Sequence, residues 1–229
     1  MSTTISRQLV RRTVAPASPA ASLRRFALCG QLAGPLMLGA ILVLDWLDPN
    51  VTSLADPISY LGARGALYAP AMNAVLALGG LLFAGGALAL QRALPRLPWR
   101  WQPVLAVALF GIVGMLGAAL LPCDFHCSDG SVQGKLHYVP AAMGWGLLLF
   151  GLRALPSQLA LDPGWAAHAT WPPRLLQASL LLSLLFQLGG LRIVPALHPY
   201  VGIIQRLFLL AIFAALYAAA RHLRQLAAS

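Results

Sequence analysis

Charged residues are scarce in this sequence, and acidic residues are the scarcest of all. Asp, Glu, Lys and Arg make up 10% of the 229 residues, only 6 residues are acidic, and hydrophobic residues make up 59%. A soluble domain carries about 25% charged residues. The composition therefore excludes an ordinary soluble domain and indicates an integral membrane protein.

Several recognisable signatures are also missing. The sequence has no phosphate-binding loop, no dinucleotide-binding fingerprint and neither an HExxH nor a GxSxG motif, so the chemistries that these motifs carry have no support. No segment alternates polar and apolar residues, which argues against a transmembrane barrel. No histidine lies deep inside an apolar stretch, where a haem would need its axial ligand.

Six apolar stretches remain, each close to the length of about 20 residues with which a helix crosses a bilayer. They span approximately residues 26–47, 69–91, 102–121, 138–155, 174–194 and 201–220. We therefore predict an all-α, polytopic membrane protein with a six-helix transmembrane bundle at 26–220. Residues 1–25 are predicted to be a disordered, basic cytoplasmic tail, and residues 221–229 a second cytoplasmic tail.

The basic residues predict the orientation of this bundle. If the N-terminus is cytoplasmic, 12 of the 16 basic residues lie on the cytoplasmic side. They are Arg7, Arg11, Arg12, Arg24, Arg25, Arg92, Arg96, Arg100, Arg153, Arg174, Arg221 and Arg224. The positive-inside rule then places both termini in the cytoplasm and the protein in the inner (cytoplasmic) membrane. Because the arginines flank separate apolar stretches instead of forming one patch, we expect no nucleic-acid partner.

The stretch LPCDFHCSDGSVQGKLH, residues 121–137, gathers reactive side chains in a loop predicted to face outward. In an oxidising compartment, Cys123 and Cys127 are expected to form a disulfide that closes a small loop. Free thiols are one alternative. A metal bound through Cys123, His126 and Cys127 is another, although a lone pair of cysteines lacks the repeated spacing of a structural zinc site. We expect no other cofactor.

Three histidines are predicted on the outer side of the bundle: His126, His137 and His198. With the outer aspartates they could form a metal site of the hydrolytic kind, in which three nitrogen ligands leave room for a water. The alternative is that they are simply solvated or hydrogen-bonded at the interface. His137 opens the fourth predicted span, where its ring can point into the bundle.

One arginine lies inside a predicted span. Arg206 is about 10 Å below the outer end of the sixth span, at 1.5 Å per residue. A charge at such a depth needs a partner and suggests a functional site. Asp45, near the outer end of the first span, is the candidate, with Asp56 and Asp124 as alternatives. Such an ion pair is either structural or part of a site that holds the head group of a ligand.

The first outer loop contains the sequence LADPISYLG at residues 54–62. Asp56 followed by Pro57 is typical of a helix N-cap with proline in the first position. This predicts a short interfacial helix whose Ile58, Tyr60 and Leu61 lie on the bilayer. In a compatible functional interpretation, Asp56 and Ser59 face a pocket on the outer rim.

A family resemblance joins these motifs. In chain order they are GP at 34–35, DPISYLG at 56–62, Asn73, LPCD at 121–124 with Cys127, His137, and GIIQR at 202–206. In this order they resemble the DUF998 family of six-span bacterial and archaeal membrane proteins of unknown activity. The resemblance covers roughly residues 26–220. It implies that Asp56, Ser59, Asp124, His137 and Arg206 belong to one shared pattern, and it implies no substrate.

Three functions are compatible with these observations, and whether the protein is an enzyme stays open. The first is an outer-leaflet pocket that binds or processes a membrane lipid or small amphiphile. Arg206 would hold the head group, and the catalytic candidates would be Asp56, Ser59, Asp124 and His137. The second is a non-enzymatic accessory or scaffold subunit of a membrane complex. The third is a small transporter, which the confinement of polar residues to the outer half disfavours.

Overall fold

The computed structural model describes residues 19–94, 102–128, 130–161, 163, 165 and 171–226. Within these residues the chain is helix, turn and loop, without a strand. The helices are α1 (Pro19–Leu47), α2 (Ala69–Ala93), α3 (Pro103–Leu109), α4 (Gly117–Leu120), α5 (Val132–Leu159), α7 (Trp171–Gly190) and α8 (Val201–Leu226). A π-helical segment, η3 (Phe110–Leu116), joins α3 to α4 in one continuous rod. The predicted all-α class is confirmed.

Among the described residues, five helical segments are long and apolar enough to cross a membrane. They are Ala21–Leu47, Ala69–Ala93, Pro103–Leu120, Val132–Leu159 and Pro195–Leu226. Within α7, the apolar helix Arg174–Gly190 is shorter than these. The chain is therefore an integral membrane protein by the length and composition of its helices. The count of six spans stays a prediction.

Several helix boundaries differ from those that the sequence predicts. Helix α1 begins at Pro19, so residues 19–25 are helical and do not belong to a disordered tail. Helix α8 continues to Leu226, beyond the predicted end of the last span. Helix α5 begins at Val132, because the Ser131 side chain accepts a hydrogen bond from the Gly134 N–H and caps the helix (3.0 Å).

Other predictions fall outside the described residues. These are the remainder of the two tails, at 1–18 and 227–229, together with Arg96 and Arg100.

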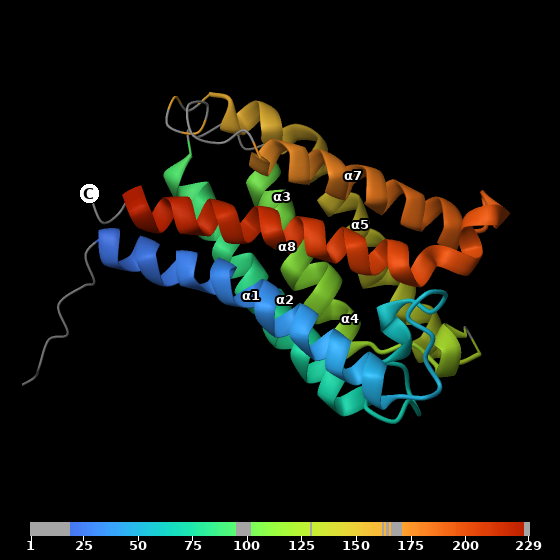
Figure 1. The fold of residues 1–229 in the computed structure, drawn as a ribbon. Helices are drawn as coiled ribbons and strands as arrows, with labels where there is room; N and C mark the ends of the chain where they lie inside the picture. Colours follow the sequence, from blue (N-terminus) through green and yellow to red (C-terminus); the bar gives the residue numbers. More distant parts are fainter. Residues whose placement is uncertain are drawn as a thin grey trace, which may run out of the picture.

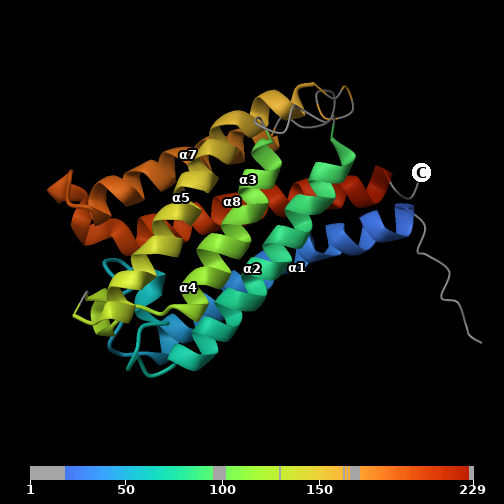
Figure 2. The same ribbon diagram turned by 180° about the vertical axis from the view of Figure 1, so that it is seen from behind.

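The helices form a bundle, which Figures 1 and 2 show from two opposite sides, and their contacts close into a ring. In order around the ring, α1 contacts α2, α2 contacts the α3–α4 rod, the rod contacts α5, α5 contacts α7, α7 contacts α8, and α8 contacts α1. The start of α1 and the end of α8 lie at one end of the bundle, which we call the terminal end. The connections at 48–68, 121–131 and 191–200 gather at the other end, which we call the loop end.

Glycine permits the closest helix crossings in this ring. A Cβ placed on Gly86 of α2 would lie 2.5 Å from the Cα of Gly30 in α1. A Cβ on Gly144 of α5 would lie 2.4 Å from the Cα of Gly114 in η3. Both crossings therefore depend on the absence of a side chain, as is usual where helices associate in lipid.

Candidate functional site

The charged pair expected inside the bundle is present at the loop end. The Arg206 Nε–H donates to Asp45 Oδ2 over 2.7 Å, and Nη2 donates to Asp45 Oδ1 over 2.6 Å. The two side chains are 10% and 7% exposed, respectively. This two-point geometry is the strong form of an arginine–carboxylate contact. It joins the C-terminal end of α1 to α8.

The remaining donors of Arg206 are directed at backbone. Its Nη1 donates to the carbonyl oxygens of Ser53, Asp56 and Gly202, at 2.9–3.0 Å. Gly202 permits this approach, because a Cβ there would lie 2.6 Å from the carbonyl oxygens of Ser53 and Asp56. The guanidinium therefore binds the loop after α1 as well as Asp45, which leaves little of it free for a ligand.

Two further polar side chains fix the same loop to the bundle. The Ile58 N–H donates to Gln205 Oε1 of α8 over 2.8 Å, and Asn73 Nδ2 of α2 donates to the Gly62 carbonyl over 2.9 Å. Ile58 is 7% exposed and Leu61 is fully buried. The prediction that these two side chains lie on the bilayer is therefore wrong, because the short helix η1 (Ile58–Tyr60) turns its apolar side into the bundle.

Asp56 and Ser59, two of the catalytic candidates, lie in this loop. Pro57, not Asp56, immediately precedes η1, and the Asp56 carboxylate instead accepts the Thr52 N–H over 2.7 Å. Among the described residues, nothing forms a hydrogen bond with the Ser59 hydroxyl. In this part of the chain, no base is therefore positioned to activate Ser59 as a nucleophile.

Cys123 and Cys127 form the disulfide that the sequence predicts. The loop that it closes holds His126 and Cys127 in the left-handed region, with φ of 54° and 49°. The Arg64 N–H donates to the Cys123 carbonyl over 2.8 Å, and the Tyr138 hydroxyl donates to the Cys127 carbonyl over 2.6 Å. These contacts fix the disulfide loop against the first loop and against α5.

Asp124 accepts three hydrogen bonds at the N-terminus of α5. The Ser131 N–H donates to Oδ2 over 2.7 Å, the Ser131 hydroxyl donates to Oδ1 over 2.8 Å, and Arg64 Nη1 donates to Oδ1 over 3.3 Å. The two bonds from Ser131, the backbone bond first, hold the pKa of the Asp124 carboxyl below its usual value, and Arg64 adds a smaller effect. Asp124 thus stabilises the start of α5 as an anion.

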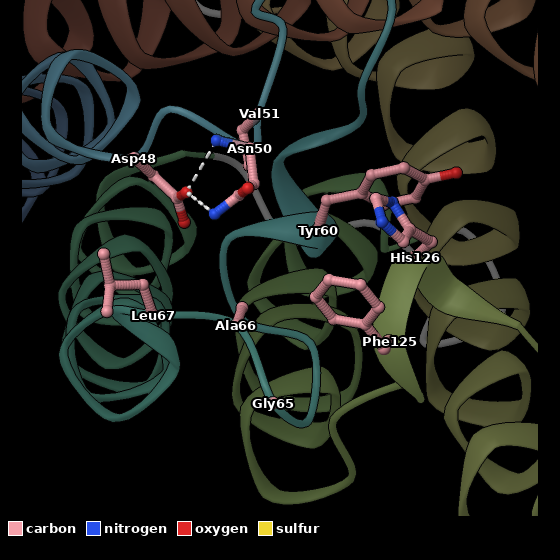
Figure 3. A pocket seen from close by; sticks show the side chains of 9 residues that line it. All are labelled: Asp48, Asn50, Val51, Tyr60, Gly65, Ala66, Leu67, Phe125 and His126. Carbon is pink, nitrogen blue, oxygen red and sulfur yellow. Dashed lines mark hydrogen bonds between the residues drawn. The ribbon is translucent and has the colours of Figure 1, made fainter.

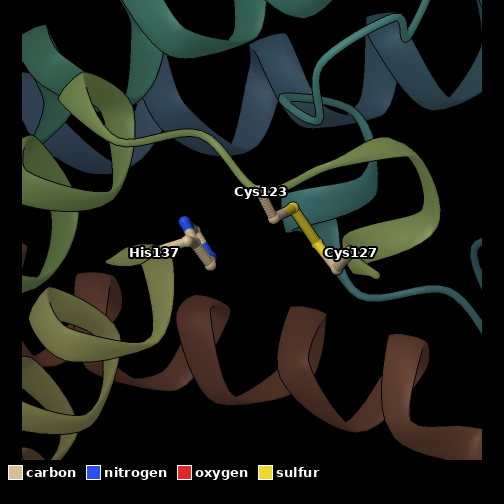
Figure 4. Close-up of side chains that lie close together, drawn as sticks. All are labelled: Cys123, Cys127 and His137. Carbon is tan, nitrogen blue, oxygen red and sulfur yellow. A yellow bond between two sulfur atoms is a disulfide. The ribbon is translucent and has the colours of Figure 1, made fainter. Parts of the chain in front are cut away.

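His137 is buried, and its Nδ1 lies 2.7 Å from the Leu121 carbonyl oxygen, to which it donates as the Nδ1–H tautomer. Its ring lies beside the disulfide (Figure 4), and these three residues are the one group of three potential metal ligands in the part of the chain that the structure describes. Because the two sulfurs are bonded to each other, neither cysteine is a thiolate, which is the form that binds a metal. Among the described residues, His126, His137 and His198 do not lie together as a group of potential metal ligands.

A pocket of about 220 Å³ lies at the loop end, and the sequence does not predict it. Figure 3 shows Asp48 and Asn50 on one side of it and the rings of Tyr60, Phe125 and His126 on the other. Asp48 follows directly on α1 and is only 2% exposed. The sequence Asp48-Pro49-Asn50 signals a turn, but no local pattern indicates that aromatic rings from two other segments face it.

A comparison with protein-family models gives one match. Residues 31–222 match the model of the family described as "Protein of unknown function (DUF998)". The chain belongs to the DUF998 family. It matches none of the curated proteins and none of the solved structures with which it was compared.

The five residues that the DUF998 resemblance groups into one pattern all lie at the loop end, yet they do not converge on one point. They are Asp56, Ser59, Asp124, His137 and Arg206. Among the described residues, the single hydrogen bond that joins two of them runs from Arg206 to the backbone carbonyl of Asp56. Asp124 binds Ser131 and Arg64, and His137 binds Leu121. What this set shares is the anchoring of the two loops and of the start of α5.

Proposed function

We propose that this DUF998 protein crosses the membrane six times with both termini in the cytoplasm. We further propose that its loop end holds, on the outer side, a small pocket that binds the head group of a lipid or a small amphiphile. The pocket itself is the observation that carries this proposal. A volume of about 220 Å³ is below the range of about 300–1,000 Å³ of sites for drug-sized ligands, so it suits a head group better than a whole lipid.

The distribution of basic residues supports the orientation. The described arginines at the terminal end come from the start of α1, the end of α2, the last turns of α5, the start of α7 and the end of α8. They are Arg24, Arg25, Arg92, Arg153, Arg174, Arg221 and Arg224. The loop end has few basic residues, and two of them, Arg64 and Arg206, pair with aspartates. By the positive-inside rule the terminal end is cytoplasmic.

Exposed aromatic side chains support a position of the pocket at the membrane surface. Trp46, in the last turn of α1, is 84% exposed, and Tyr138 and Tyr200 are each about half exposed. Tryptophan and tyrosine concentrate at the level of lipid head groups. Asp48 lines the pocket and follows Trp46 by two residues, which supports a position of the pocket at this level.

Binding is better supported than catalysis. The four catalytic candidates of the sequence analysis have structural contacts or, in the case of Ser59, no activating base among the described residues. We infer that Asp56, Asp124 and His137 shape the loop end. The ion pair of Arg206 and Asp45 is likewise assigned to loop anchoring and not to recognition of the ligand.

A substitution that fills the pocket tests this proposal. Ala66 lines the pocket, and Ala66→Trp is expected to reduce the lipid that the protein retains on purification, measured by mass spectrometry of extracted lipids. Ala142→Trp, on the exposed surface of α5, is the matched control. Equal lipid retention in both variants, with thermal unfolding unchanged, would refute a binding role for the pocket.

The orientation has its own test. A fluorescent protein that folds only in the cytoplasm is fused after Ser229, and fluorescence is expected. A dark fusion of a fully expressed, membrane-inserted protein would contradict cytoplasmic termini.

A further inference from the structure

The most buried carboxylate of the described residues has no cation beside it. Asp48 is 2% exposed and forms no ion pair with any described residue, whereas Asp45 pairs with Arg206 and Asp124 pairs with Arg64. Its two hydrogen bonds come from the N–H and the side-chain amide of Asn50, at 3.0 and 3.2 Å. Both reach Oδ1, as Figure 3 shows. Within the described chain, Oδ2 therefore has no donor.

A buried carboxylate is costly without a countercharge. Asp48 lines the pocket, so a positively charged group in the pocket would supply what the protein itself does not. The same charge disfavours an anion such as a free phosphate in this position. The ligand group that Asp48 selects is therefore a cation.

The other side of the pocket is aromatic. The rings of Phe125 and His126 lie 4.1 Å apart between centroids, and those of Tyr60 and His126 lie 5.5 Å apart, each pair edge to face. Burial, with the nearby Asp56 second, raises the pKa of the Tyr60 phenol, so that this ring stays neutral. Neutral aromatic faces attract cations, and quaternary ammonium groups are bound in this way.

The combination distinguishes an organic cation from a metal ion. Calcium takes six to eight oxygen ligands and magnesium six in octahedral geometry, whereas three of the side chains around this pocket are aromatic rings. An alkylammonium group is satisfied by one carboxylate and by aromatic surface against its methyl or methylene groups. A pocket of about 220 Å³ has room for such a group.

We propose that the pocket binds an alkylammonium group, with Asp48 as its counter-ion and the rings of Tyr60, Phe125 and His126 as its walls. This inference rests on the proposed function and names the chemistry of its ligand. The position at head-group level points to the amine of a phospholipid such as phosphatidylethanolamine or phosphatidylcholine. A soluble amine carries the same chemistry, and the experiment below separates the two sources.

The experiment compares lipids with the same acyl chains and different head groups. The full chain in detergent is titrated with phosphatidylethanolamine, phosphatidylcholine or phosphatidylglycerol, and bound lipid is counted by native mass spectrometry. Wild-type protein is expected to prefer the two ammonium lipids. Asp48→Asn, whose side-chain oxygen can still accept both bonds from Asn50, should bind them about tenfold more weakly, because the charge-assisted contact is lost.

Two more variants keep the test decisive. Phe125→Leu retains apolar volume and loses the ring, and a loss of about threefold for the ammonium lipids is expected. Phe125→Leu also tests the proposal by itself if Asp48→Asn does not fold. Ala142→Trp, on the exposed surface of α5 and outside the pocket, should keep wild-type preference. To test whether the ligand is a soluble amine, choline or ethanolamine is added to wild type and to Asp48→Asn, and the shift of the thermal unfolding midpoint is measured.

The outcomes are distinct. Loss of head-group preference in Asp48→Asn and Phe125→Leu supports the inference. If choline shifts the thermal midpoint while the protein shows no preference among lipids, the ligand of the pocket is a soluble amine. If Ala66→Trp removes lipid while Asp48→Asn and Phe125→Leu change nothing, the pocket binds lipid but the ammonium assignment is wrong. If none of the variants changes binding, both the inference and the proposed function fail.

Discussion

The two ends of the bundle are held together by different means. At the loop end, Arg206, Gln205 and Asn73 extend from helices and bond to backbone groups of residues 53–62. Toward the terminal end, helices meet through glycine, as at Gly30 and Gly86, and a void of only about 30 Å³ lies among apolar side chains. The pocket at the loop end is several times larger.

The difference follows from the backbone. A helix satisfies its own N–H and C=O groups, so helices in lipid can pack with apolar and small side chains alone. An irregular loop that packs against the bundle leaves backbone groups without partners, and each costs free energy unless a side chain binds it. Asn73 of α2 and Gln205 and Arg206 of α8 lie where a loop folds back onto the bundle, and their side chains bind its backbone groups.

The largest expected effect comes from breaking the ion pair of the loop end. Arg206→Met should lower the free energy of unfolding by about 3–5 kcal/mol, because it leaves Asp45 buried without a partner. The cost also includes three carbonyl oxygens that lose their donor. Thermal unfolding in detergent measures this loss.

Arg224→Met at the terminal end is the matched control, since Arg224 is exposed and donates only one described hydrogen bond, to Gln31. Its effect should stay within about 0.5 kcal/mol. The double variant Asp45→Leu/Arg206→Met should recover part of the loss. Equal effects of the two arginine substitutions would remove the distinction between the ends.

The next effect is expected where glycines bring helices together. Gly86→Ala should lower the free energy of unfolding by about 1–3 kcal/mol, because the new methyl group meets the backbone of Gly30 and forces α1 and α2 apart. Gly39→Ala on α1 has open space around its Cβ and serves as the control. The measurement is thermal unfolding, and indistinguishable midpoints would contradict tight packing at this crossing.

Removal of the disulfide should act on the loop end alone. Replacing both cysteines, Cys123→Ser with Cys127→Ser, should cost about 2 kcal/mol, as expected for so short a closed loop. Binding at the pocket should weaken as well, because the disulfide loop positions Phe125 and His126. Lipid binding by native mass spectrometry is compared with thermal unfolding. Full stability with unchanged binding would show that the loop keeps its shape without the bond.

The smallest effect is a dependence on pH. The folded-state pKa of Asp124 is lowered from its ordinary 3.8, so the unfolded chain binds the proton more tightly. The stability contributed by Asp124 is complete above about pH 4 and is lost as the pH falls through the folded-state pKa. Thermal midpoints of wild type and Asp124→Asn should therefore differ at pH 6 and converge in acid. A constant difference at every pH would assign the effect to something other than the charge.

Local patterns in the sequence predict much of this structure. Long apolar stretches predict the helices, the short spacing of Cys123 and Cys127 in an outer loop predicts their disulfide, and an arginine inside a span predicts a buried partner. Helix α5 begins at Val132, earlier than the predicted span of residues 138–155. The polar residues before His137 are typical of a loop, but Ser131 caps the helix there and Asp124 binds Ser131. The sequence does not predict the pocket, because the residues that line it come from three separate segments. These are residues 48–51, residues 60–67 and the disulfide loop.

The sequence by itself determined the class of the protein, since hydrophobicity and charge act through composition and need no knowledge of contacts. It also determined the family and the segments of the chain in which the acidic residues gather. Only the tertiary structure decided what those residues do. Asp45 pairs with an arginine, whereas Asp48 pairs with none among the described residues. The difference depends on which side chains the folded loops bring within about 3 Å of each carboxylate. That distance is set by the packing of helices far apart in the chain.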